Sequence, residues 1–168
     1  MTTMKKIKTV VTVSLMTIAF SLAPLSIQAH GEEHTEQLEF EPMENDFGSY
    51  EPNMEITRTI DIVMSDQMRF TPDAVEVKKG DVIKFVHTNT GKIKHEFVLG
   101  TPDVLSKHYE MMKKFPTMEH SEPYMLHVSP GKKGAIVWKF SKAGEFAFGC
   151  LIPGHYEAGM KGTVKVGS

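Results

Sequence analysis

The sequence predicts an all-β domain, an antiparallel sandwich or barrel, preceded by an export signal and an acidic arm. Two observations carry the fold prediction. Beyond Glu55 the chain consists of short apolar or alternating runs, which is the pattern of strands with one buried face. Turn residues separate these runs at a spacing that favours an antiparallel sandwich or barrel over alternating helices and strands.

Each expected strand is a run of this kind. The eight strands are expected at residues 56–64, 74–77, 82–88, 95–99, 125–128, 135–140, 145–150 and 163–166. Turns rich in Gly, Pro and Asn are expected at residues 79–81, 89–91, 129–131 and 142–144. Between Thr101 and Tyr124 the alternation stops, so we expect a long excursion there with a helical segment over residues 102–114.

Residues 1–29 have the three parts of a secretory signal. A basic start with three lysines precedes an apolar run over residues 10–23, and small residues end the segment at Ala29. We expect cleavage after Ala29. Polar residues interrupt the apolar run, which favours a cleaved signal over a retained membrane anchor, and no later segment has the character of a span.

Residues 30–55 are expected to form a mobile acidic arm. The segment holds nine acidic residues and no lysine or arginine, a composition typical of solvated, disordered chain. Its scattered Leu38, Phe40, Phe47 and Tyr50 could dock a short piece on the domain, but they sustain no helical or strand period. The domain itself is therefore predicted to span residues 56–168.

The charge and the cysteine content exclude some partners and some roles for this protein. The net charge is −2, with 21 acidic against 19 basic residues and no basic block, so nucleic acid is not expected as a partner. Exported proteins normally pair their cysteines, yet Cys150 is the only cysteine, and no internal disulfide can form. Cys150 is then an inert buried thiol, half of an intermolecular bridge, a nucleophile or a metal ligand.

The neighbours of Cys150 favour the metal ligand. A thiolate, an imidazole and a thioether recur at five-residue intervals at Cys150, His155 and Met160, in a loop between two expected strands. Soft sulfur together with imidazole selects copper, and two histidines and a cysteine with a weak axial methionine form the ligand set of a blue-copper site. A buried structural thiol would be the preferred interpretation of Cys150 alone, and a cysteine–histidine nucleophile lacks an oxyanion-hole signature here.

This loop supplies three ligands, so a second histidine must come from elsewhere. His95 follows a turn and opens an expected strand, which can place its ring at the end of the sandwich beside the cysteine loop. The alternative is His87, which we expect to face solvent or a neighbouring strand.

The side chain of Cys150 is expected to point into the core. Phe146, Phe148 and Cys150 share one strand face, so the sulfur would point inward. A thiolate in such dry surroundings would be unfavourable without a cation.

The segment from Gly134 to Val166, with His95-Glu96-Phe97 upstream, resembles a cupredoxin. Its Cys-x4-His-x4-Met spacing is similar to that of the rusticyanin and auracyanin type, whereas plastocyanin has a shorter gap between cysteine and histidine. Trp138-Lys139-Phe140, Gly144-Glu145-Phe146 and the loop from Cys150 to Met160 resemble the periplasmic cupredoxins associated with bacterial copper tolerance. The resemblance covers about two thirds of the chain.

The resemblance implies a Greek-key β-sandwich with one type 1 copper ion, held by His95, Cys150, His155 and Met160. With the export signal, we expect a periplasmic, monomeric protein with a one-electron Cu(I)/Cu(II) centre. An enzyme is not expected, because the His-x-His pairs of a multicopper oxidase and the second cysteine of a dinuclear copper site do not occur in the chain.

Two functions stay open at this stage. Copper homeostasis and tolerance is favoured by the acidic arm, the methionines and the closer family resemblance. The alternative is a soluble electron carrier between redox partners, which the type 1 site alone would favour; the sequence identifies no partner protein.

Two additional copper sites are also conceivable. After cleavage, His30 would offer its α-amine and imidazole together, near His34, as a chelate for Cu(II). The stretch over residues 108–127 is rich in side chains that favour Cu(I), although loop methionines also pack onto domains. These side chains are Met111, Met112, Met118, Met125, His108, His120 and His127.

Overall fold

The structure is a computed structural model that describes residues 40–118 and 120–168. The expected signal over residues 1–29, its cleavage after Ala29 and the chelate at His30 and His34 lie outside the described residues. Within them, no helix combines the length and the apolar character needed to cross a membrane.

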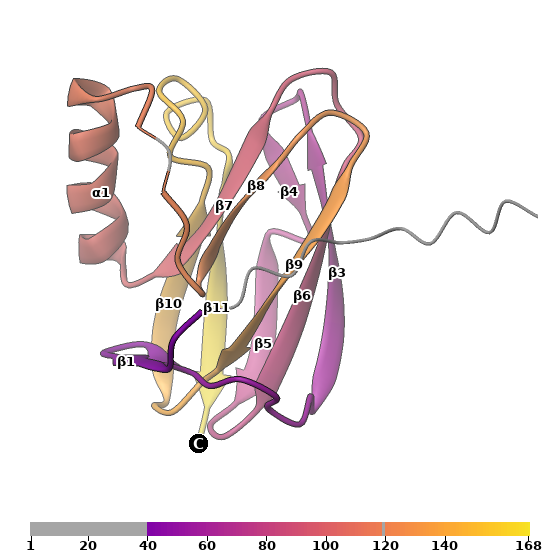
Figure 1. Cartoon of the computed structure of the whole chain (residues 1–168), viewed down its shortest axis with the longest axis vertical. Helices are drawn as coiled ribbons and strands as arrows, with labels where there is room; N and C mark the ends of the chain where they lie inside the picture. The colour runs from indigo at the N-terminus through magenta and orange to yellow at the C-terminus, as the bar shows by residue number, and fades with distance from the viewer. Residues whose placement is uncertain (1–39, 119) are drawn as a thin grey trace, which may run out of the picture. The chain divides into compact units, whose positions relative to one another are not determined.

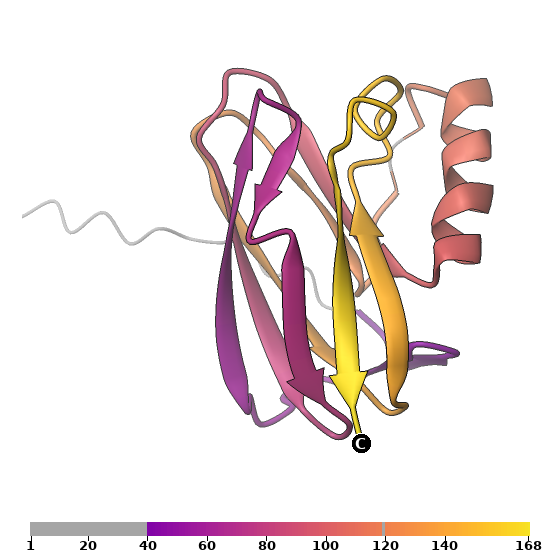
Figure 2. The same cartoon turned by 180° about the vertical axis from the view of Figure 1, so that it is seen from behind.

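Two β-sheets pack face to face around a hydrophobic core, which confirms the predicted all-β sandwich (Figure 1 and Figure 2). In spatial order, the first sheet contains β1 (Met43–Asn45), β2 (Gly48–Tyr50), β9 (Lys133–Lys139), β6 (Val82–Asn89), β3 (Arg58–Ser65) and β4 (Arg69–Thr71). The second contains β5 (Ala74–Lys78), β11 (Lys161–Gly167), β10 (Gly144–Gly149), β7 (His95–Gly100) and β8 (Met125–Val128).

All eight predicted strands are present, with ends that differ by a few residues, because each is a clear apolar or alternating run. In β3, for example, Ile60, Ile62 and Met64 are buried and the residues between them are exposed. Two strand pairs are parallel, β3 with β6 and β5 with β11, where the sequence spacing suggested antiparallel pairing throughout. The reason is that the chain leaves the first sheet after β4, forms β5 in the second sheet, and then returns to the first as β6.

Residues 43–50 form a hairpin within the segment for which we expect a mobile arm. β1 and β2 pair antiparallel, and Ser49 pairs with Lys139 of β9. Phe47 is buried, its ring stacks on Trp138 with centroids 5.2 Å apart, and its carbonyl accepts a hydrogen bond from Trp138 Nε1. The first sheet therefore begins before Ile56. Three-residue strands are too short to show a period, so sequence reasoning could offer docking of this piece only as an option.

The helix α1 (Pro102–Lys114) has the bounds that the sequence predicts. Thr101 caps it by accepting a hydrogen bond from the Val104 N–H, and Pro102 occupies the first turn, where it costs no helical hydrogen bond. The helix packs on the outer face of the second sheet. The apolar cluster beneath it contains Val98, Leu105, Tyr109, Met112, Met125 and Leu151.

Strand β7 is consequently covered on both faces. The core between the sheets lies on one side and the apolar cluster under α1 on the other, and all six of its residues are buried. His95 and Glu96, adjacent on this strand, are both fully buried although both are polar. Such groups need specific partners, and these partners define the site described below.

His87 lies in the core, and the expectation that it faces solvent or a neighbouring strand is wrong. Its side chain is 0% exposed and its ring centroid lies 4.2 Å from that of Phe97. On β6 it is in phase with Ile83 and Phe85, which also face the core, so strand parity was the available signal. Neither ring nitrogen has a hydrogen-bond partner in the described part of the chain, and burial lowers the pKa of His87 to about 3.

This histidine is expected to make the fold acid-sensitive. Below the ordinary pKa of 6.5 the unfolded chain takes up a proton that the folded chain refuses, so stability falls as the pH drops towards about 3. The contribution of this one group is about 3 kcal/mol at about pH 4.5. His87→Leu should therefore be more stable than the unmodified protein by about that amount at about pH 4.5, and by less at neutral pH. Urea unfolding of both proteins at the two pH values measures this, and an equal difference at both would contradict it.

Candidate metal centre

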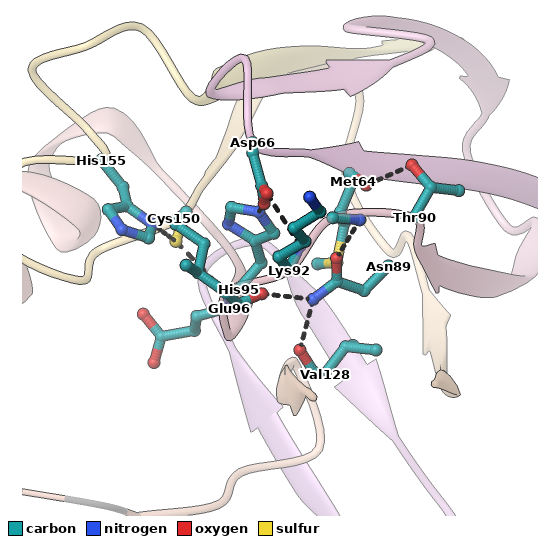
Figure 3. A network of polar contacts seen from close by, with 12 residues as sticks. Met64, Asp66, Asn89, Thr90, Lys92, His95, Glu96, Val128, Cys150 and His155 are labelled. Atoms are coloured by element: carbon teal, nitrogen blue, oxygen red, sulfur yellow. Dashed lines mark hydrogen bonds and ion pairs between the residues drawn. The ribbon is translucent and has the colours of Figure 1, made fainter. Parts of the chain in front are cut away.

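Three of the four predicted ligands meet at the end of the sandwich where β6 and β10 end and β7 begins (Figure 3). One ligand atom each from His95, Cys150 and His155 can be chosen so that all three lie within 4.8 Å of one another. Cys150 Sγ is 3.3 Å from His155 Nδ1, and the two imidazole centroids are 5.2 Å apart. Met160, the fourth predicted ligand, is fully buried at the end of the same loop.

The loop from Cys150 to Met160 is closed by its own backbone. The Cys150 N–H donates to the Met160 carbonyl, and the Met160 N–H donates to the His155 carbonyl, both at 3.0 Å. Arg69 adds a side-chain bond from Nη1 to the Ala158 carbonyl at 2.7 Å. Gly159 has φ +99°, and a Cβ there would lie 2.7 Å from Arg69 Nη1, so this position requires glycine. The loop is thus a fixed frame for its side chains.

Asn89 holds the turn that leads into His95 (Figure 3). Its Nδ2 donates to the carbonyls of Ile93 and Val128 at 2.8 and 2.9 Å, and its Oδ1 accepts from the Gly91 N–H. The amide is buried, and these bonds use both of its N–H donors and one of the two acceptor positions of its oxygen. His95 therefore starts β7 from a rigid turn.

Asp66 orients the His95 ring. Asp66 Oδ1 lies 3.2 Å from His95 Nε2, and its Oδ2 accepts from the Lys92 N–H at 2.7 Å. The Lys92 N–H lowers the pKa of Asp66, and the bond with His95 adds to this. A carboxylate at Nε2 favours the tautomer with the proton on that nitrogen, which leaves a lone pair on Nδ1. His95 Nδ1 is buried and has no hydrogen-bond partner among the described residues.

The sulfur of Cys150 is also in dry surroundings. Cys150 is 0% exposed, and its Sγ accepts a hydrogen bond from the Glu96 N–H at 3.3 Å. Burial raises the pKa of the Cys150 thiol to about 12, and burial lowers the pKa of His155, with the His95 ring as a smaller cause. The thiolate therefore needs a cation beside it, while the imidazole stays neutral and can offer a lone pair. This donor set, together with the unpartnered Nδ1 of His95, fits a copper ion.

Sequence reasoning missed three residues that support this cluster. Asp66 stands in the turn after β3 and Asn89 ends β6, at positions where such residues are common, so no sequence signal marked them. A usable signal existed for Glu96, because an acidic residue interrupts the apolar run of β7. Its Oε2 accepts a hydrogen bond from the Leu151 N–H at 3.0 Å, so both its main chain and its side chain hold the start of the cysteine loop.

Comparison with known proteins finds copper-binding relatives. Residues 57–167 match the family model described as copper binding proteins of the plastocyanin/azurin family. The copper-resistant cuproprotein CopI of Rubrivivax gelatinosus is 51% identical over 109 residues, which cover 65% of this chain and 66% of that protein. CopI of Vibrio cholerae is 35% identical, with 80% of this chain and 79% of that protein covered.

The solved structure of reduced auracyanin from Roseiflexus castenholzii matches with a TM-score of 0.58 at 23% identity. The match covers 68% of this chain and 100% of that one. At this identity the likeness shows the fold alone, and it is the fold that the sequence predicts.

Proposed function

Because the chain belongs to the plastocyanin/azurin family of copper-binding proteins, and is thus the cupredoxin that its sequence resembles, we propose that it binds one type 1 copper ion through His95, Cys150, His155 and Met160 and serves copper tolerance. One observation carries the proposal: a buried imidazole nitrogen without a partner, His95 Nδ1, belongs to a cluster with a buried sulfur and a second imidazole. The CopI relatives are named for copper resistance, which favours that function.

Each side chain has a separate task in this proposal. Copper in such a set supplies one-electron redox chemistry. Cys150 gives the thiolate, whose charge the Glu96 N–H helps to stabilise. Asp66 keeps the His95 proton on Nε2, and the main-chain bond from Met160 to His155 keeps the two ends of the loop together. A fixed frame of this kind limits rearrangement when an electron enters or leaves.

We place this function in the periplasm, with residues 1–29 as a signal cleaved near Ala29 and residues 30–168 as the exported protein. The protein is proposed to bind copper and exchange electrons without turning over a substrate. A soluble electron carrier is the second candidate. One feature favours it: Cys150 and Met160 are buried, whereas His155 is partly exposed. The His155 ring could therefore contact a redox partner and carry the electron to or from the copper.

Deleting the gene and titrating copper against growth tests the tolerance role. The deletion strain is expected to lose growth at copper concentrations that the parent tolerates, and to be rescued by the intact gene. A gene carrying Cys150→Ser should not rescue growth, whereas one carrying Ala147→Ser, a change in β10 three residues before Cys150, should. Unchanged copper tolerance together with impaired respiration would favour the electron carrier instead.

The carboxylate of Asp66 is expected to tune the centre. Asp66→Asn removes a negative charge beside His95, which disfavours Cu(II) relative to Cu(I), so the reduction potential should rise. Copper affinity should fall by about 10–100-fold, the range for outer partners of metal-binding histidines. Redox titration and competition with a chelator measure the two effects.

The matched control is Asp81→Asn. Asp81 also accepts a backbone hydrogen bond, from the Lys78 N–H, but it lies at the other end of β6. The same change in net charge there should leave the potential and the affinity unchanged. Equal shifts in the two variants would refute a specific role for Asp66.

A further inference from the structure

A second group of titratable side chains lies on the other side of β7 from the copper ligands. Its members come from four elements: Glu96 from β7, His108 from α1, His120 from the segment between α1 and β8, and His127 from β8. Because neighbours on a strand point to opposite faces, Glu96 is directed away from the His95 ring, as Figure 3 shows. Glu96 and His127 are directly opposite in the β7–β8 pair, with Glu96 Oε1 3.1 Å from His127 Nε2.

Two imidazole nitrogens in this group are buried without partners. The rings of His108 and His120 are neighbours, with centroids 4.8 Å apart. His108 Nε2 and His120 Nδ1 have almost no solvent exposure, and neither makes a hydrogen bond within the described residues. A buried polar atom without a partner costs about 1–3 kcal/mol. One partner bound to both atoms would remove this cost at both rings, and a metal ion can bind both lone pairs.

The spacing of the rings matches that of the first site. The centroids of His95 and His155 are 5.2 Å apart, and those of His108 and His120 are 4.8 Å apart. Burial lowers the pKa of His108, which keeps its ring neutral and its lone pair available. Two neutral imidazoles thus lie side by side, each with an unpartnered nitrogen among the described residues.

The surroundings favour a cation of soft character. Glu96 is 0% exposed, and among the described residues its Oε1 has the ion-pair contact with His127 but no hydrogen bond, so a positive ion nearby would stabilise its charge. The chain between β7 and the end of β8 contains four methionines, and two of them, Met112 and Met125, are buried in the cluster under α1. Imidazole combined with thioether suits Cu(I) better than hard divalent ions.

We propose that His108 and His120 form a second copper site, in which His108 Nε2 and His120 Nδ1 bind Cu(I) beside the carboxylate of Glu96. This site is separate from the one at Cys150 and does not depend on it. Glu96 joins the two regions, since its main-chain N–H donates to the Cys150 sulfur, while its side chain pairs with His127 and its charge acts on His108.

Copper stoichiometry tests the proposal. Because His30 and His34 can also bind metal, the reference is the exported full chain with His30→Gln and His34→Gln. Under anaerobic conditions, Cu(I) buffered by a competing chelator should load two ions on this reference, and an equal concentration of Zn(II) should not displace the second. Adding His108→Gln and His120→Gln should reduce the loading to one ion. After oxidation, the thiolate-to-copper absorption of the first site should be unchanged by these two substitutions.

The outcomes separate the two sites. Loading of one ion on the reference, or of two ions on the His108→Gln/His120→Gln chain, would overturn the second site. Displacement by Zn(II) would overturn its preference for copper. A third outcome would count against the first site alone: the reference shows no thiolate-to-copper absorption after oxidation, yet the double variant still binds one ion fewer than the reference.

Nitrogen NMR of the reference chain keeps the proposal testable should the double variant not fold. Cu(I) is diamagnetic, so imidazole nitrogen signals can be followed through the titration. The His108 Nε2 and His120 Nδ1 signals should shift as the second equivalent binds, while the His87 signals, from a ring buried in the core, should not move. Unmoved His108 and His120 signals up to two equivalents would contradict the site.

Discussion

Replacing Cys150 with serine is expected to abolish the intense visible absorption of the copper-loaded protein, because that absorption comes from charge transfer between thiolate and copper. The serine hydroxyl can still accept the hydrogen bond from the Glu96 N–H, so the fold should survive. Copper affinity at this site should fall by more than the roughly 100-fold that the loss of an outer partner costs, since a direct ligand is lost. Visible spectra and chelator competition measure both effects.

Ala147→Ser provides the matched control. It adds a hydroxyl to β10, the strand that leads into Cys150, on the face that packs under α1 and not on the face towards the core, where Cys150 lies. Its spectrum should be that of the unmodified protein. A Cys150→Ser protein that kept the visible band would show that the sulfur is not the ligand.

Glu96→Ala is expected to be strongly destabilising. The change leaves the Leu151 N–H without its acceptor, removes the partner of His127 and opens a cavity beneath α1. Together these effects should lower the free energy of unfolding of the copper-free protein by about 2–4 kcal/mol. Copper affinity at the Cys150 site should fall as well, because the start of the loop is no longer held. Denaturant unfolding at neutral pH measures the first effect.

Glu96→Gln separates the hydrogen bond from the charge. The amide oxygen can still accept from the Leu151 N–H and the side chain keeps its volume, so the loss in free energy should be less than half of that for Glu96→Ala. If the two variants were equally destabilised, the charge and not the hydrogen bond would be the cause. If Glu96→Ala were as stable as the unmodified protein, the clamp on the cysteine loop would be refuted.

Most of the fold could be predicted from local sequence patterns. The eight longer strands are apolar or alternating runs that could be predicted, and Thr101-Pro102 marks the start of α1 with a cap and a first-turn proline. The hairpin β1–β2 and the short β4 (Arg69–Thr71) show no usable period. Phe47 is buried by Trp138, a residue far along the chain, and no local pattern contains such a contact. The parallel pairs likewise depend on where the chain changes sheets.

The candidate copper ligands could be predicted from the sequence for a related reason. Cys150, His155 and Met160 are close in sequence because one loop carries them, and His95 opens a strand after a recognisable turn. The residues that orient these ligands are not local to them. Asp66 lies 29 residues before His95, and Glu96 acts on Leu151 across a separation of 55 residues. Only the folded chain shows such contacts.

An anomalous difference map at the copper absorption edge, from crystals of the protein loaded with one equivalent of copper, tests the central claim most directly. The account predicts that the strongest peak lies within bonding distance of Cys150 Sγ, His95 Nδ1 and His155 Nδ1. A strongest peak elsewhere, with no copper at the Cys150 sulfur, would contradict it.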